Sequence, residues 1–127
     1  MHFAWRKEKH FIEEANKLLE YHPLYENEII FYFGFRLGQH KKWEDLTIIF
    51  RPPTDFPDAM LVDYKTGEAL NVEFEVNSSG FKPHITKNGD KAIADCDLIV
   101  CAKHDWDDCP LDVYDIISDS FHRVKKD

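Results

Sequence analysis

The sequence lacks any apolar run of about 18 residues, the length that a membrane-spanning helix requires. Its first residues, MHFAWRKEKHF, also lack the apolar segment of an export signal. Low-complexity tracts and internal repeats are absent as well. We therefore expect a soluble, cytoplasmic protein without a membrane partner.

Cysteine is scarce, and Cys96, Cys101 and Cys109 are an odd number in a chain without an export signal. A disulfide framework is therefore not expected. A zinc site that adds His84 or His104 is an alternative, but structural zinc sites usually contain two closely spaced cysteine pairs. Cys96 and Cys101 are also an odd number of residues apart in a predicted strand, so they would face opposite sides. Buried free thiols are the expected role.

Positive charge is also in short supply. The 16 Lys and Arg residues oppose 24 Asp and Glu residues, which gives a formal net charge of −8. This charge argues against broad nonspecific binding to nucleic acids or anionic membranes, and it counts against a nuclease. Many of the acids fall within 105–119, however, while several lysines lie elsewhere, between 41 and 91.

The chain has enough apolar material for one folded domain. Its 127 residues are 43% hydrophobic and 14% aromatic, and this length fits a single core rather than two. We expect one domain over 1–127, with no disordered tract.

Two segments near the start differ in how clearly they predict their structure. Residues 4–21 have apolar positions at three-to-four spacing, which predicts an amphipathic helix that ends at His22-Pro23. Residues 26–43 are ambiguous: β-branched and aromatic residues favour a strand, whereas the length and the lack of alternation allow a buried helix.

The rest of the chain alternates strand-like and loop-like segments. A strand at 46–50 and the Pro-rich connection RPPTDFP come first, and the pattern then predicts a hairpin at 58–77 and a loop with some helix at 81–94. A strand covered on both faces is predicted at 96–102 and an edge strand at 111–117. The order helix, strands, helix, strand predicts a mixed α/β (α+β) fold.

The stretch VEFEVN at 72–77 alternates strictly, so Glu73, Glu75 and Asn77 share one face of a strand. Two acids this close stay ionised cheaply only in water or beside a cation. They form either a solvated sheet face or a metal site. Asp58 lies before the partner strand of the hairpin and can reach the same end of the sheet. Clustered carboxylates suit Mg²⁺ or Mn²⁺ better than zinc.

Pro57-Asp58, a hairpin and then Glu73-Phe74-Glu75 resemble the PD-(D/E)XK pattern of restriction-endonuclease-like nucleases, in the variant that has glutamate in place of lysine. The longer series FPD, VEFE, SSGFKPH, CDLIVC and HDW is similar to small uncharacterised proteins assigned to that superfamily. The resemblance covers 26–117 and leaves 1–23 as a helical extension. It implies a restriction-endonuclease-like mixed central sheet flanked by helices, with a helix at 26 to about 40.

The resemblance also implies a DNA endonuclease that hydrolyses phosphodiester bonds with Mg²⁺ or Mn²⁺. Asp58 and Glu73 would bind the metal, joined by Glu28 from the preceding helix and by the carbonyl of Phe74. Glu75 would orient or deprotonate the attacking water, and Lys82 could supply the positive charge of the missing lysine. In an alternative register Glu75 is the ligand and Asn77 replaces the lysine.

Further residues would contact the substrate or support the site: Ser78, Ser79, His84 and His104. Turn formation is the simpler role for the two serines, and packing is the expected role of Trp106. A homodimer would allow both DNA strands to be cut. A catalytically inactive binding or assembly module on the same fold is the alternative function, because fold does not imply activity.

Overall fold

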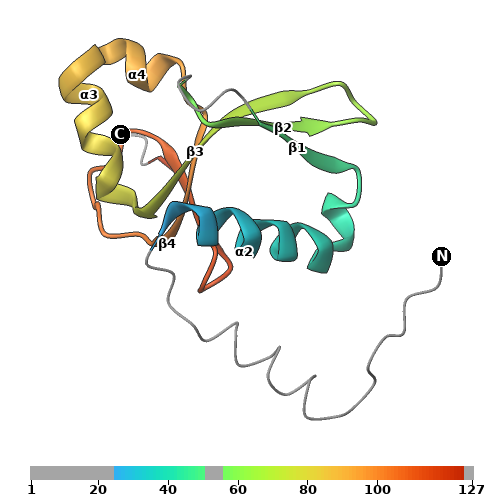
Figure 1. Ribbon diagram of the computed structural model, residues 1–127. Coiled ribbons are helices and arrows are strands. Elements are labelled where there is room, and N and C mark those ends of the chain that lie inside the picture. The colour runs from blue at the N-terminus through green and yellow to red at the C-terminus, as the bar shows by residue number, and fades with distance from the viewer. Residues whose placement is uncertain (1–24, 51–55, 125–127) are drawn as a thin grey trace.

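The structure is a computed structural model that describes residues 25–50 and 56–124 (Figure 1). The helix predicted over 4–21 and part of the Pro-rich connection lie outside the described residues. Within them the elements are α2 (Glu26–Gln39), η1 (Lys41–Trp43), β1 (Leu46–Phe50), β2 (Ala59–Asp63), β3 (Ala69–Asn77), η2 (Ser78–Phe81), α3 (Lys82–Asn88), α4 (Asp90–Ala94), β4 (Leu98–Lys103), β5 (Asp112–Asp115) and β6 (Ser120–His122).

The described strands form one mixed sheet in the order β1-β2-β3-β4-β5-β6. β3 and β5 run parallel to β4, whereas the β1–β2, β2–β3 and β5–β6 pairs are antiparallel. Helix α2 covers one face, and α3 and α4 cover the other, as Figure 1 shows for the two sides of β3 and β4. The mixed α/β (α+β) fold class predicted from the sequence is confirmed.

Helix α2 forms from the segment that was locally ambiguous. Its buried residues Ile29 and Phe33 are four positions apart, which places both on the face that packs against the sheet. In its last turn, Arg36 donates hydrogen bonds from Nε and Nη2 to the carbonyl oxygens of Ile116 and Ile117, at 2.8 and 3.0 Å. The helix implied by the family resemblance is confirmed, and strand propensity is overridden by packing.

The β2–β3 hairpin is confirmed, and its turn has a clear local cause. The Asp63 carboxylate accepts hydrogen bonds from the backbone N–H groups of Lys65 and Thr66, at 2.8 and 3.1 Å. Gly67 follows with φ at +77°, a conformation that glycine adopts without a Cβ clash. The turn therefore sets the register that aligns Ala59 with Val72 near the other end of the hairpin.

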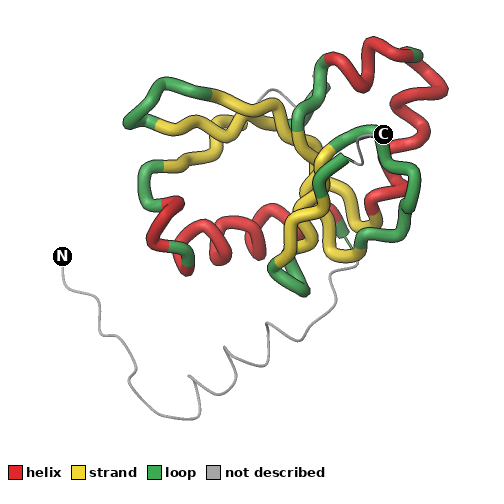
Figure 2. Tube along the Cα trace, turned by 180° about the vertical axis from the view of Figure 1, so that it is seen from behind, coloured by secondary structure: helices red, strands yellow, loops and turns green. Residues whose placement is uncertain are grey.

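Strand β4 is buried on both faces, as its continuous apolar sequence predicted. Leu98, Val100 and Ala102 pack in the core beneath α2. Ile99 and Cys101 pack in the opposite core, beneath α3 and α4. The yellow strands seen from behind in Figure 2 pass between these helical layers. This central position fixes the neighbouring strand β3, which carries the acidic residues.

Two sequence-based expectations are wrong. The 111–117 segment is not the edge of the sheet, because β6 pairs with β5 on its outer side. Cys96 and Cys101 do not face opposite sides, because both pack in the core beneath α3 and α4. Strand β4 begins only at Leu98, so strand alternation does not apply to Cys96. Both thiols are free and buried, as expected.

None of the described helices is long and apolar enough to cross a lipid bilayer.

Candidate functional site

Strand β3 is longer than its neighbour β2, and this difference creates the setting of the acids. Pairing with β2 ends at Val72, opposite Ala59, whereas pairing with β4 continues to Asn77. The second half of β3 therefore has β4 on one side and no β2 partner on the other. Glu73 and Glu75 lie in this half.

Asp58 lies where β2 and β3 separate, and two hydrogen bonds tie it to β3, one with the Glu73 side chain and one with the Phe74 backbone. The backbone N–H of Asp58 donates to Oε2 of Glu73 at 3.1 Å. The backbone N–H of Phe74 donates to Oδ2 of Asp58 at 3.1 Å. The structure thus brings together the two acids that the hairpin spacing placed at one end of the sheet.

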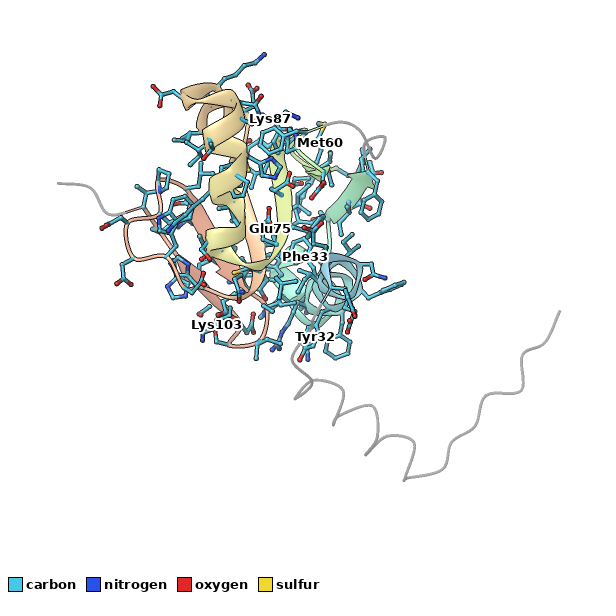
Figure 3. The ribbon with its side chains drawn as sticks, turned by 60° about the vertical axis from the view of Figure 1, so that its left-hand side comes forward. Tyr32, Phe33, Met60, Glu75, Lys87 and Lys103 are labelled. Carbon is cyan, nitrogen blue, oxygen red and sulfur yellow. The ribbon has the colours of Figure 1, made fainter. Side chains whose placement is uncertain are left out.

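Glu73 and Glu75 are both buried, with 4% and 6% of their surface exposed. Their neighbours Val72 and Phe74 pack in the core beneath α2, so the two acids point to the other face, toward α3. Figure 3 shows the labelled Glu75 between α3 and α2. A solvated sheet face is therefore wrong, and the question becomes what balances two buried carboxyl groups.

His84 of α3 lies beside both acids. Its Nε2 lies 3.4 Å from Oε1 of Glu73 and 3.5 Å from Oε1 of Glu75. The ring stacks on Phe56, with centroids 4.6 Å apart and planes 28° apart, and it also packs against Phe81. Donor atoms of Glu73, Glu75 and His84 all lie within 4.8 Å of one another. His84, expected from the sequence to contact substrate, thus lies among the acids.

The buried carboxyl groups have strongly shifted protonation. Burial raises the pKa of Glu75 to about 8, with further increases from the nearby charges of Glu26 and Asp58. Burial also raises the pKa of Glu73, and the hydrogen bond and charge of Asp58 raise it further. The pKa of His84 is lowered, mainly by burial, so its imidazole favours the neutral form. Without a cation the cluster holds protons at neutral pH, and a bound cation would replace them.

The helical acid that reaches the cluster is Glu26, two positions before the predicted Glu28. The Glu26 carboxyl hydrogen-bonds the Glu75 carboxyl, and its pKa is raised by burial and by Asp58. Two positions correspond to about 200° around a helix, so Glu28 points away from the direction of Glu26. No interaction found in residues 25–50 and 56–124 joins the Glu28 side chain to the acids, and its place in the site stays a prediction.

Lys82, the predicted source of positive charge, is directed elsewhere. Its Nζ lies over the Trp106 ring, 5.3 Å from the centroid, and Trp106 packs against the core beneath α3, as expected of a packing residue.

Lys87 is three positions after His84 on α3, and its charge contributes to lowering the His84 pKa. Because helix positions three apart are neighbours, that spacing was the available signal for Lys87.

Ser78, Ser79 and His104 form a separate network. Ser78 Oγ lies 2.8 Å from His104 Nδ1 and accepts a hydrogen bond from the Asp105 backbone N–H at 3.0 Å. Ser79 donates to the Asp105 carboxylate from its N–H and its hydroxyl, both at 2.9 Å. These bonds tie η2 to the segment after β4. Ser78 is fully buried, which fits the turn-forming role, while contacts with substrate stay predictions.

The cysteines lie outside the cluster of potential metal ligands. Across the described ranges, the group of potential ligands whose donor atoms converge consists of Glu73, Glu75 and His84. Cys109 packs at the border of the same core as Cys96 and Cys101.

The alternative register, in which Glu75 is the ligand and Asn77 replaces the lysine, stays open. Asn77 ends β3, opposite Lys103 of β4.

Gly80 leaves room for the Glu75 carboxylate, and this gives a test of the site. A Cβ at Gly80 would lie 2.7 Å from Oε2 of Glu75, closer than van der Waals contact allows. We expect Gly80→Ala to displace this flexible carboxylate and to weaken Mn²⁺ binding about tenfold, measured by calorimetric titration, while the melting temperature falls by only a few degrees.

Gly34→Ala is the matched control. A Cβ at Gly34 would meet no atom within 4 Å, and alanine favours a helix by about 1 kcal/mol relative to glycine. We expect it to raise the melting temperature slightly and to leave Mn²⁺ affinity unchanged. Equal affinities for wild type and Gly80→Ala would show that Glu75 Oε2 has no role in binding.

No protein-family model matches the chain, and searches of curated proteins and of solved structures return no similar protein. The site consists of two buried carboxyl groups and one partly exposed imidazole, with Asp58 and Glu26 beside them.

Proposed function

We propose that this protein is a metal-dependent endonuclease of the PD-(D/E)XK type that hydrolyses phosphodiester bonds of DNA. The observation that carries the proposal is the meeting of Asp58, Glu73 and Glu75 where β2 separates from β3. The order helix, hairpin, helix, parallel strand agrees with the fold that the resemblance implies.

The residues present fit a divalent cation. Glu73 and Glu75 are buried, and the Oε1 atoms of both face Nε2 of His84 at 3.4 and 3.5 Å, longer than a good hydrogen bond. Buried carboxylates are costly in their charged form, and a cation between them would neutralise both. Carboxylate donors suit Mg²⁺ or Mn²⁺.

The chemistry divides between the ion and the chain. A bound divalent ion supplies Lewis-acid stabilisation of the attacked phosphate and makes water more acidic. Asp58 and Glu73 would hold the ion, with the Glu73 carboxyl oriented by the Asp58 N–H and the Asp58 carboxyl by the Phe74 N–H. Glu75, freed of its proton once the ion is bound, would orient the attacking water and accept its proton.

Cleavage assays test this proposal directly. Purified protein is incubated with duplex, single-stranded or branched DNA, with Mg²⁺, with Mn²⁺ or with a chelator. We expect metal-dependent cleavage of at least one substrate. Comparing nicked with fully cut duplex at several protein concentrations shows whether a homodimer cuts both strands. Absence of cleavage with every substrate and metal would refute the nuclease function, and absence of metal binding as well would refute the metal site.

Lys87 and Lys82 form a matched pair on α3 for locating the positive charge. Lys87 acts on His84 electrostatically, whereas Lys82 lies over Trp106. We expect Lys87→Ala to slow cleavage by about 10- to 100-fold, because a cation near the scissile phosphate stabilises its developing charge. Lys82→Ala should slow it by less than about threefold. The rates are measured in single turnover. A larger loss for Lys82→Ala than for Lys87→Ala would show that Lys82 supplies the positive charge, as the sequence predicts.

A catalytically inactive binding or assembly module on the same fold is the second candidate. It is favoured by the net charge of −8, by glutamate at the expected lysine position, and by the position of Lys82 over the Trp106 ring. Tight DNA or protein binding without cleavage under any metal condition would support it. Cleavage lost on substitution of Asp58 or Glu73 would exclude it.

A further inference from the structure

We propose that His84 is a metal ligand, and that the Glu73–Glu75–His84 group selects first-row transition ions such as Mn²⁺ over Mg²⁺. This inference rests on the metal site of the proposed nuclease, in the alternative register in which Glu75 binds the ion, and assigns its metal class. It adds a nitrogen donor that the acidic pattern of the sequence does not contain. The main evidence is that His84 Nε2 lies close to one carboxylate oxygen of each of the buried residues Glu73 and Glu75.

The distances from His84 fit donors around a common centre. Nε2 lies 3.4 and 3.5 Å from the Oε1 atoms of Glu73 and Glu75, and the three donor atoms all lie within 4.8 Å of one another. Donors that bind one ion at about 2.1–2.4 Å are separated by about 3.0–3.9 Å for bond angles between 90° and 110°. The separations found before any ion is added therefore require little movement for coordination.

A simple hydrogen bond does not account for this arrangement. A ring N–H directed at a carboxylate would bring one oxygen to about 2.7–3.0 Å. Nε2 is instead nearly equidistant from both oxygens, at 3.4 and 3.5 Å. One N–H cannot point at two acceptors on different residues with good geometry at once, so the shared space between the three groups is better filled by a cation.

The imidazole is held in place by packing. Phe56 stacks on one side of the ring, with centroids 4.6 Å apart, and Phe81 packs against it at 5.4 Å. Only the short helix η2, Ser78–Phe81, separates β3 from α3, and Phe81 is fully buried. His84 therefore comes from an element that is anchored directly after the strand that carries the carboxylates. Such fixed geometry is what a metal ligand requires.

The donor set decides the class of metal. Mg²⁺ prefers oxygen ligands and retains several waters, whereas Mn²⁺, Fe²⁺, Co²⁺ and Zn²⁺ accept imidazole nitrogen together with carboxylates. In a site with oxygen donors alone, Mg²⁺ would compete better with the transition ions. The nitrogen of His84 therefore shifts the preference toward the transition ions, and Mn²⁺ is the probe that follows this shift.

Metal binding without DNA tests the inference. Metal-free protein is titrated with Mn²⁺, and free Mn²⁺ is followed by electron paramagnetic resonance, with Mg²⁺ added as competitor. We expect His84→Gln to weaken Mn²⁺ binding by about 10- to 100-fold, because removing even a group that supports a metal ligand has effects of this size. Mg²⁺ affinity should change by less than about threefold. His84→Asp, which offers an oxygen donor, should shift the preference toward Mg²⁺.

His122→Gln is the matched control, because His122 is exposed and lies beside His104 rather than the acids. It should leave both affinities unchanged, and melting curves confirm that each variant is folded. Equal weakening of Mn²⁺ and Mg²⁺ by His84→Gln, or no change in either, would overturn the assignment. Selective Mn²⁺ binding through His84 without DNA cleavage would refute the nuclease and leave this assignment intact.

Discussion

Asp58→Asn and Glu73→Gln are each expected to reduce metal-dependent DNA cleavage by at least about 100-fold. Loss of one preorganised electrostatic contact to a transition state commonly has an effect of 10²–10³-fold, and these residues would also hold the ion that provides it. Both substitutions remove a negative charge while nearly preserving shape. The measurement is the single-turnover rate at saturating Mn²⁺ or Mg²⁺.

The local hydrogen bonds explain why these variants should stay folded. Asp58→Asn retains a carbonyl oxygen that can accept from the Phe74 N–H, and Glu73→Gln retains one for the Asp58 N–H. Their melting temperatures should therefore lie at or above that of the wild type without metal. A rate loss in a folded variant can then be attributed to the missing charge.

Glu68→Gln is the control for the loss of an acid in the same hairpin. Glu68 is exposed at the turn between β2 and β3, at the opposite end from Asp58. Its substitution should leave the cleavage rate within about twofold of the wild type. If Asp58→Asn and Glu73→Gln cleave as fast as Glu68→Gln, the site has been placed wrongly.

The parts of the fold set by local pattern could be predicted from the sequence. Alternation in VEFEVN and the turn chemistry after Asp63 gave the hairpin that brings Asp58 to Glu73. The apolar run from Leu98 gave a strand buried on both faces. These features depend on neighbours in the chain, so their physical causes are visible in short segments.

The parts that depend on tertiary packing could not be predicted in the same way. Alternation in β3 indicated one buried face, yet α3 covers Glu73 and Glu75 as well. The rotational phase of a helix decides between Glu26 and Glu28, and between Lys82 and Lys87. Glu26 and Glu28 are two positions apart and Lys82 and Lys87 are five apart, so the two side chains of each pair face different sides of the helix. Which side faces the acids depends on packing, and the spacing between His84 and Lys87 becomes informative only once the position of His84 is known.

The burial of Glu75 predicts an unusual dependence of stability on pH in the metal-free protein. Its pKa is raised from 4.5 to about 8 in the folded state, so the folded chain holds this proton more tightly than the unfolded chain. The resulting stabilisation is complete below the unfolded value of 4.5 and is lost as the pH rises through about 8. The raised pKa of Glu73 acts in the same direction. Between about pH 6 and 9 we expect a loss of about 2 kcal/mol, or about 5 °C or more in melting temperature.

Glu75→Gln should remove much of this pH dependence. Relative to the wild type, the variant should be more stable without metal and less stable with metal. Without metal at about pH 8.5, the neutral amide avoids a buried charge, so the variant should melt above the wild type. With Mn²⁺ at about 100 times its dissociation constant, the wild type should gain about 2.7 kcal/mol and the variant much less, so their order should invert. A variant less stable than the wild type in both conditions would mean that Glu75 is held by its contacts with Glu26 and His84 and not kept for a cation. The inversion distinguishes a structural role of Glu75 from a role in metal binding. Packing contacts do not depend on the ion, whereas a carboxylate buried for metal binding is destabilising until the ion is present.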